Sequence, residues 1–281
     1  MDEDFTLEEL LIARMAREFG GEAITVGATL LADLAARLAK ATHAPDAFLT
    51  TASRAAADPD VHAKSLSDEW VLCRTARMAL DWEQMFQLIA KGRLQIWVGA
   101  VQVDRHGASN ISVIGDWARP KVQLIGARGV PDDLWGCARI CYHVRTQTKR
   151  TLVERVDFEC AFGNRDARAR PGGPAARPGV VVTDLGVYDF ETEDGRMRVA
   201  SLHPGVDFAT AQARCGFELA RPDGPIPVTP PPTPLQRRLI RERLDPLGLR
   251  RLESVDATDA LTLELWRADL PPARAPRGAA P

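Results

Sequence analysis

Short apolar segments and amphipathic helical segments alternate through the first half of the chain, and this order restricts the folds that it can adopt. Apolar residues between positions 6 and 19 recur at helical spacing, and Thr6 with Glu9 forms the pattern of a capping box. We expect helices at 6–19, 29–41 and 79–92, and strands at 23–27, 47–52, 94–100 and 139–144. This alternation is typical of an open, mostly parallel sheet with helices on both faces, so the predicted fold class is α/β.

The second half of the chain predicts a small antiparallel β portion. Strand patterns occur at 150–158, 181–190 and 196–202, and helical patterns at 207–216 and 234–244. Two segments rich in Pro, Gly or Arg, residues 164–179 and 222–234, are expected to be surface loops, the second an extended linker unable to build a ladder. Residues 1–250 are predicted to form one domain, and 251–281 a C-terminal extension that is partly disordered, above all at its end.

Composition and charge exclude several classes of protein. The formal net charge is -2, with basic and acidic residues interspersed, so the chain lacks the basic stripe of a nucleic-acid-binding protein. Its 5 cysteines are odd in number and dispersed, which favours reduced core thiols over a disulfide framework. The acidic N-terminus is unlike a signal peptide, and no apolar stretch reaches membrane-spanning length. We therefore expect a cytoplasmic protein with no membrane partner.

Motifs that declare a reaction by themselves are absent from the sequence, including a nucleophile elbow, a phosphate-binding glycine loop and a metalloprotease helix. Cys137 and Cys141 have no second ligand pair nearby, so core packing is favoured and we assign no metal. The five histidines are isolated from one another and are interpreted as structural, with His203 in a rigid His-Pro-Gly turn.

One short segment, Gly126 to Gly129, offers two interpretations. Its closely spaced glycines follow an apolar segment and would let backbone N–H groups approach a ligand carbonyl, as an oxyanion hole requires. A plain tight turn has the same spacing, and on spacing alone the turn is favoured.

Several segments together resemble the beta subunit of the family I CoA-transferases, to which glutaconate CoA-transferase belongs. The segments are TVG (25–27), APD (44–46), VGAVQVDRHGASNIS (98–112), GDWARPKVQLIGARG (115–129), KRTLVERVDF (149–158), VVTDLGVYDF (181–190) and SLHPGV (201–206). Their order and spacing are kept over most of residues 6–250. The resemblance implies the open α/β fold of this family and an active site that handles CoA thioesters.

The chain departs from this family at the nucleophile. Where CoA-transferases carry a glutamate in a Glu-Ser-Gly type motif, this sequence reads Ala52-Ser53-Arg54. A methyl group can neither attack a thioester nor carry CoA, so covalent transfer through this position is excluded. QVDRHGASNIS, RPKVQLIGARG, KRTLVE and SLHPGV are similar to a branch that also lacks the glutamate, the two-subunit hydrolase that opens the last steroid ring in bacterial cholesterol and bile-acid degradation.

That resemblance implies a function for the chain as one subunit of an enzyme. It would pair with a homologous alpha subunit, as a heterodimer or heterotetramer, and cleave a carbon–carbon bond in a ring-bearing acyl-CoA by retro-Claisen hydrolysis. The alpha subunit would supply the catalytic glutamate, and coenzyme A would enter only as part of the substrate, with no bound cofactor. Residues expected to line the cleft are Ser53, Gln102, Asn110, Gly126, Arg128 and Gly129. Two alternatives remain, the beta subunit of a CoA-transferase and a non-catalytic CoA-binding or scaffold subunit.

Overall fold

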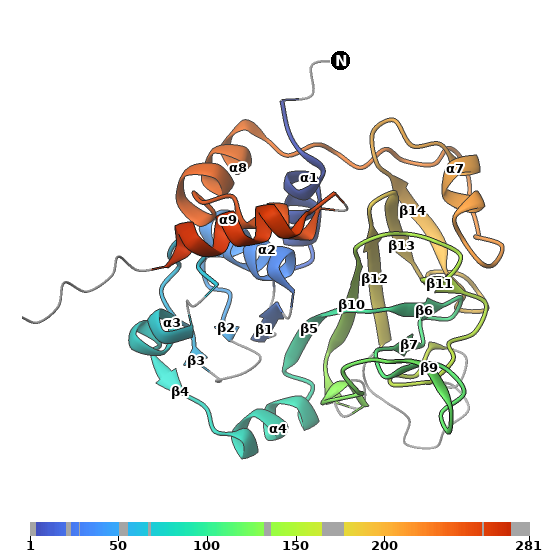
Figure 1. Ribbon diagram of the computed structural model, residues 1–281, viewed down its shortest axis with the longest axis horizontal. Helices are drawn as coiled ribbons and strands as arrows, with labels where there is room; N and C mark the ends of the chain where they lie inside the picture. The colour runs from blue at the N-terminus through green and yellow to red at the C-terminus, as the bar shows by residue number, and fades with distance from the viewer. Residues whose placement is uncertain are drawn as a thin grey trace, which may run out of the picture.

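A twisted sheet runs through the centre of the computed structural model (Figure 1), which describes residues 4–20, 24–27, 29–50, 56–66, 69–131, 136–164, 177–254 and 256–270. Its strands follow the order β14 (Arg198–Leu202), β13 (Gly186–Asp189), β12 (Arg177–Thr183), β10 (Arg139–Val144), β5 (Leu94–Gly99), β1 (Ile24–Gly27), β2 (Leu49–Thr50), β3 (Ala56–Ala57) and β4 (Met78–Ala79). The five strands from β12 to β2 are parallel to their neighbours, and the pairs at both edges are antiparallel. The predicted α/β class with a small antiparallel portion is confirmed.

Capping residues determine where the first helices begin. The Thr6 hydroxyl accepts from the Glu9 N–H and the Glu9 carboxylate accepts from the Thr6 N–H, so α1 (Leu7–Ala16) starts with the predicted capping box. Thr29 caps α2 (Leu30–Ala41), and Asp81 caps α4 (Trp82–Ala90). The helix predicted from position 79 begins later because its first residue belongs to β4.

The two faces of the sheet are covered by different elements. On one face α1 and α2 pack over Trp97, Cys141 and Val182, giving a core of buried aliphatic side chains. The other face packs against α4, α7 (Phe208–Ala213) and the strands that follow β5. Because both faces of the central strands are buried, their sequences are apolar without alternation.

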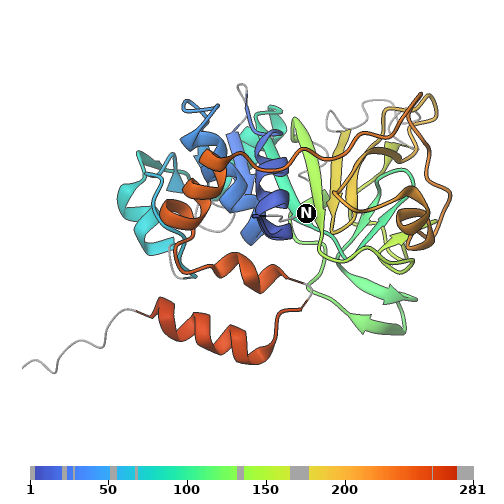
Figure 2. The same cartoon turned by 90° about the horizontal axis from the view of Figure 1, so that it is seen from above.

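Two smaller sheets and a short helix complete the described fold. The first small sheet has the order β11 (Leu152–Val153), β6 (Gln102–Asp104) and β7 (Ser109–Asn110). The second is an isolated hairpin of β8 (Val113–Gly115) and β9 (Pro120–Gln123), and Figure 2 shows it projecting away from the body. Helix α3 (Glu69–Thr75) lies between β3 and β4 in sequence. The strand predicted at 150–158 is shorter than expected, since only β11 is extended there.

Two predictions about the second half of the chain are wrong in detail. Residues 177–179, placed in the predicted loop 164–179, begin β12, and 165–176 lie outside the described residues. The single strand predicted at 181–190 is two strands, because the Thr183 hydroxyl accepts from the N–H groups of Leu185 and Gly186 and closes a turn between β12 and β13. These side-chain hydrogen bonds reverse the chain at a position where the sequence has no pair of glycine or proline residues that would predict a turn.

The proline-rich segment 222–234 also differs from its prediction as a surface linker. Val228 forms a parallel bridge with Leu202, and the Leu202 N–H donates to the Pro227 carbonyl at 3.0 Å. Thr229 is fully buried and its N–H donates to the Leu202 carbonyl at 2.7 Å. A proline lacks a donor but keeps its carbonyl, so a proline-flanked segment can still pair at isolated positions.

The chain returns to the first helices through its C-terminal part, made of α8 (Pro234–Arg238), the π-helix η1 (Leu239–Leu244), the 3₁₀ helix η2 (Leu249–Glu253) and α9 (Asp259–Asp269). The fully buried Glu9 carboxylate accepts from Arg241 at 2.8 Å and from Arg250 at 3.0 Å. Helix α9 lies within the extension predicted as partly disordered, whose last residues, 271–281, lie outside the described residues. No helix in the described ranges is long and apolar enough to cross a membrane.

Candidate active site

The carboxyl ends of the parallel strands lie side by side, and this line of strand ends is called the carboxyl edge of the sheet, as distinct from its outermost strands. In register, Val26 of β1 pairs with Thr50 of β2, and Gly99 of β5 pairs with His143 of β10. Open α/β sheets bind ligands in the crevice outside these carboxyl ends. Ala52 and Ser53 come shortly after β2 in sequence but lie outside the described residues, so their predicted place in the cleft stays a prediction.

Gln102 and Asn110, two of the predicted site residues, lie together just beyond the end of β5. The buried Asn110 amide donates to the Gln102 side-chain oxygen at 2.8 Å and to the Val113 carbonyl at 2.7 Å. Its oxygen accepts from the Ser112 N–H at 2.9 Å. These bonds engage the Asn110 amide and the Gln102 side-chain oxygen within the chain, where they hold together the loops that follow β6 and β7.

The Gly126–Gly129 loop is tied to this network. The Gly126 N–H donates to the carbonyl of Ile111, the residue after β7, at 3.1 Å, so this amide already has a partner within the chain. Both Gly126 (φ 93) and Arg128 (φ 55) have left-handed backbones. A methyl group added at Gly126 would meet nothing within 4 Å, so open space lies beside its backbone. An exposed arginine in this conformation is unusual and is typical of functional loops.

Three charged or titratable side chains at the same edge were not predicted as site residues. Burial lowers the pKa of His143 to about 4, helped by the nearby Arg145 guanidinium, so its imidazole is neutral at pH 7. Its Nε2 atom is buried and has no hydrogen-bond partner among the described residues. Burial raises the pKa of the Glu253 carboxyl, and Arg145 and the Leu30 N–H at the start of α2 oppose that rise. In the sequence, an isolated histidine and a glutamate far along the chain give no signal that both lie near Arg145.

Other residues considered from sequence have structural roles. Cys137 and Cys141 pack into cores on opposite faces of the sheet, as the core interpretation predicts. His203 is buried, with Nδ1 3.0 Å from the Thr229 hydroxyl and Nε2 2.9 Å from the Thr183 carbonyl. The Val206 N–H donates to the His203 carbonyl, which confirms the predicted turn. Among the described residues, no group of three or more His, Cys, Asp and Glu side chains could hold a metal ion.

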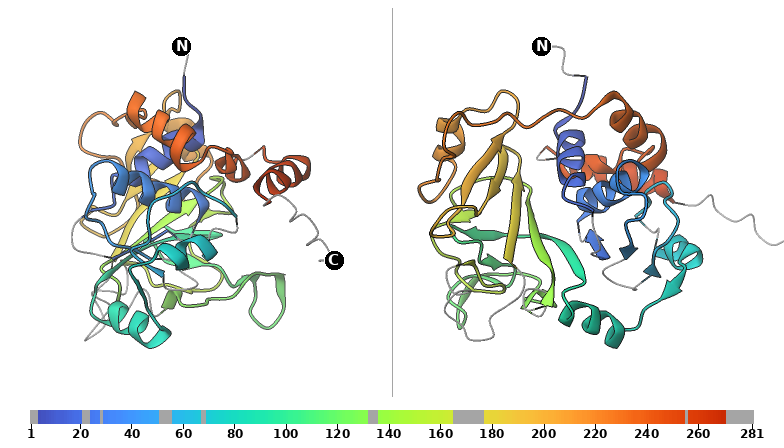
Figure 3. Two further views of the ribbon diagram at one scale, coloured as in Figure 1. Left: turned by 90° about the vertical axis from the view of Figure 1, so that its left-hand side faces the viewer. Right: turned by 180° about the vertical axis from the view of Figure 1, so that it is seen from behind.

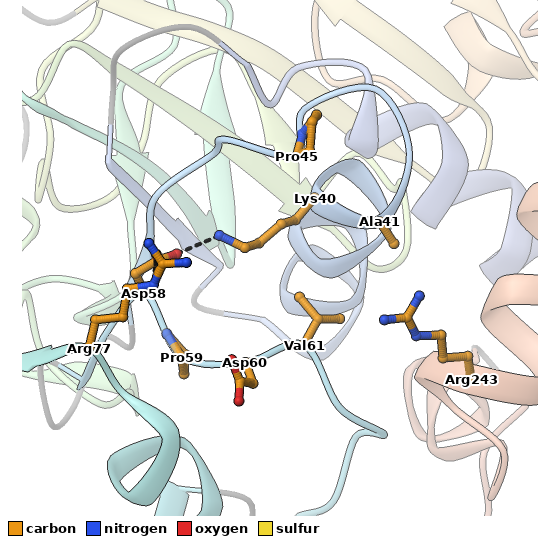
Figure 4. Close-up of a pocket in the computed structure, with 9 residues that line it drawn as sticks. All are labelled: Lys40, Ala41, Pro45, Asp58, Pro59, Asp60, Val61, Arg77 and Arg243. Carbon is orange, nitrogen blue, oxygen red and sulfur yellow. Dashed lines mark hydrogen bonds and ion pairs between the residues drawn. The ribbon is translucent and has the colours of Figure 1, made fainter.

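A polar hollow of about 240 Å³ lies at the opposite end of the strands (Figure 4). It is lined by Lys40, Ala41, Pro45, Asp58, Pro59, Asp60, Val61, Arg77 and Arg243. The buried Asp58 carboxylate pairs with Lys40 on one side and with Arg77, at 3.1 Å, on the other. This internal pairing uses two of the three cations that line the hollow, and none of the predicted site residues that the structure describes lines it.

The fold, the strand edge and the glycine loop define a class of protein. A profile of the Coenzyme A transferase family matches residues 11–210, and the chain belongs to this family. It is 36% identical over 241 residues to the cholesterol ring-cleaving hydrolase IpdB subunit of Mycobacterium tuberculosis, covering 83% of this chain and 91% of that protein. It is 33% identical over 208 residues to the B subunit of the 3-oxoadipate CoA-transferase of Pseudomonas knackmussii, covering 72% of this chain and 79% of that protein.

Solved structures give the same assignment. IpdAB of Rhodococcus jostii matches with a TM-score of 0.78 and 32% identity, covering 89% of this chain and 99% of that chain. The decarboxylase AibA/AibB matches with a TM-score of 0.78 and 25% identity, again covering 89% of this chain and 99% of that chain. The predicted resemblance to the beta subunit of the steroid ring-opening hydrolase is confirmed.

Proposed function

We propose that the chain is the beta subunit of a two-subunit hydrolase that opens a steroid-derived ring in a CoA thioester. The observation that carries this proposal is the 36% identity to a cholesterol ring-cleaving hydrolase subunit together with Ala52 at the transferase nucleophile position. The similarity to AibA/AibB adds support, since a decarboxylase also breaks a carbon–carbon bond. The names of two relatives with this fold thus describe reactions that break a carbon–carbon bond.

The chemistry of a retro-Claisen hydrolysis accounts for the loss of the glutamate. A base removes a proton from water, and the resulting hydroxide adds to a ring ketone that lies β to the thioester carbonyl. The bond from the ketone carbon to the carbon between the two carbonyls then breaks, and its electron pair forms a thioester enolate that is protonated. The ketone carbon becomes a carboxylate and the thioester stays intact. No covalent carrier is needed at any step, so alanine is tolerated at position 52.

Within this reaction the chain supplies a binding surface for developing negative charge. The open space beside Gly126 lets a ligand approach the loop backbone, and Arg128 provides an exposed cation next to it. Because the Gly126 N–H is bonded to Ile111, the remaining candidates for oxyanion donors are the amides of Ala127, Arg128 and Gly129. Gln102 and Asn110 act behind this loop by holding its base.

The proposal includes a homologous alpha subunit, which carries the catalytic glutamate, and coenzyme A as part of the substrate rather than as a resident cofactor. Relatives named IpdAB and AibA/AibB are two-component proteins, which supports such a partner. We place the complex in the cytoplasm. The five cysteines are all thiols, four of them buried, which suits a reducing compartment.

A CoA-transferase subunit is the second candidate, favoured by the 33% identity to a 3-oxoadipate CoA-transferase subunit. The test is to co-express the chain with the alpha subunit and to incubate the complex with a cyclic β-keto acyl-CoA. The hydrolase predicts loss of the ring with no glutamyl-CoA adduct on either subunit. A trapped adduct, together with transfer of CoA to an added carboxylic acid, would instead establish the transferase. An intact complex that retains full turnover after replacement of Arg128 and Gly129 would favour a scaffold role.

A further inference from the structure

Helix α9 is apolar on two opposite sides, although only one side packs on the body. Leu265 is 1% exposed and anchors the helix, whose end is held by the Asp269 carboxylate accepting from the Ser65 hydroxyl and the Leu66 N–H. Leu263, Trp266 and Leu270 are 51%, 50% and 47% exposed. Leu263 and Trp266 are three residues apart and lie on one side of the helix, turned away from Leu265, and Leu270 directly follows the last helical residue.

A second exposed apolar surface lies on the β8–β9 hairpin and on the residues just after β9, which together are called the hairpin arm. Trp117, Val122 and Ile125 are 64%, 49% and 70% exposed. Trp117 stacks on Phe158 at 4.7 Å between ring centroids, and the Gly115 N–H donates to Asp157 at 2.8 Å, so the hairpin is anchored at its base. An isolated two-stranded hairpin and a helix of 11 residues are both only marginally stable in water. A partner that covers their apolar side chains would stabilise both.

The hairpin and α9 project on the same side of the molecule, as Figure 2 and the left panel of Figure 3 show. Both are joined to the carboxyl edge of the sheet. The exposed Ile125 directly precedes Gly126 of the candidate oxyanion loop. At the other end of the edge, Arg145, which follows β10, donates to the Ser254 carbonyl just after η2, and α9 begins a few residues later.

From this arrangement we infer that α9 and the β8–β9 hairpin form two arms of one docking surface for the alpha subunit. The inference rests on the proposed two-subunit function. If the alpha subunit supplies a glutamate to the cleft, it must reach the strand edge beside Gly126, and the arms flank that approach. Exposed aromatic and aliphatic side chains on both arms then become the buried centre of the interface. Helix α9 lies beyond the family match at residues 11–210.

Three double variants of the full chain, each co-expressed with the alpha subunit, test the inference. Leu263→Ser with Trp266→Ser changes the helix arm, and Val122→Ser with Ile125→Ser changes the hairpin arm. Trp82→Ser with Phe86→Ser on α4 is the matched control, since these side chains are 64% and 46% exposed but lie away from both arms. Circular dichroism of each variant verifies folding, and sedimentation velocity across a dilution series gives the Kd between the subunits.

We expect each arm variant to raise the Kd between the subunits at least about tenfold, and the control to change it less than about threefold. An unchanged Kd in both folded arm variants would overturn the inference, as would weakening confined to the α4 control. Arm variants that keep the alpha–beta pair but lose a heterotetramer would assign the surface to a second copy of this chain and would also overturn it. If the wild-type subunits do not associate at all, the proposed function itself fails, which is a distinguishable result.

Discussion

At the position of the transferase glutamate the chain carries Ala52, which can neither attack a thioester nor carry CoA. A hydrolytic mechanism has no use for a nucleophile there, so Ala52→Glu should not raise the rate of ring opening above the wild-type value. We expect an equal or lower kcat/KM, measured on the co-purified complex with a cyclic β-keto acyl-CoA. A rise in ring opening would show that the position still takes part in covalent catalysis.

Gly126 is the residue whose substitution best separates a ligand-binding loop from a plain turn. The side of its backbone is open, so Gly126→Ala places a methyl group where substrate is proposed to approach. We expect turnover to fall at least about tenfold, with a stability cost of about 1–2 kcal/mol from the left-handed backbone. Gly224→Ala is the control, because Gly224 has a φ of 104 and equally open surroundings. Equal turnover in the two variants would identify 126–129 as a turn only.

His203 makes stability depend on pH. Burial lowers its pKa to about 4, partly opposed by its bond to the Thr183 carbonyl, against an ordinary value of 6.5. The unfolded chain therefore binds a proton between pH 6.5 and 4 that the folded chain does not, and stability falls as the pH drops through this window. The contribution is on the order of 3 kcal/mol. Denaturant unfolding across this range should show a shallower pH dependence for His203→Asn than for the wild-type chain; an equally steep dependence in the variant would contradict this role.

At the scale of elements, the Glu9 cluster fastens α1 to the C-terminal helices. Burial raises the pKa of Glu9, but bonds from Arg241 and the Thr6 N–H and the charge of Arg250 outweigh it, so the pKa is lower than usual. Glu9→Gln leaves the mostly buried Arg250 with one carboxylate fewer, which should lower the free energy of unfolding by about 2–4 kcal/mol. Glu264→Gln, at an exposed pair 3.7 Å from Arg251, should change it by less than about 1 kcal/mol. Similar losses for both variants would contradict this account.

Elements with local signals were the ones that sequence could predict. Thr6, Thr29 and Asp81 cap their helices through bonds within one turn, so α1, α2 and α4 are visible in the sequence. The start of β12 is not, because Pro178 and Gly179 disfavour a strand that only its pairing with β10 stabilises. The bridge formed by Val228 likewise depends on a residue far along the chain.

The candidate site was predictable in its backbone but not in its side chains. The glycine loop and the strand edge follow from pattern and resemblance. Gln102 and Asn110 were expected to line the cleft, and in the structure their side chains bond to each other; an amide reads the same in sequence whether it faces a ligand or a neighbouring side chain. His143 and Glu253 reach the same edge from β10 and from the end of η2, a meeting that only the folded chain displays.

At the scale of the whole molecule, the fold presents an edge that another subunit must complete. Ala52 stands where the transferase nucleophile would be. The carboxyl edge of the sheet carries the buried, neutral His143 and the loop with Arg128. Helix α9 and the β8–β9 hairpin project beside this edge with exposed apolar side chains. These features suit a subunit that binds and orients a CoA thioester while its partner supplies the base. They are unlike a chain that performs transfer alone.

The most direct test is a mass balance for the reaction of the co-purified complex in heavy-oxygen water. The account predicts a product that has gained one water, with heavy oxygen in a new carboxylate and the CoA thioester intact. Release of free CoA, or its appearance on an added acceptor acid while the ring stays closed, would contradict carbon–carbon hydrolysis as the function of this chain.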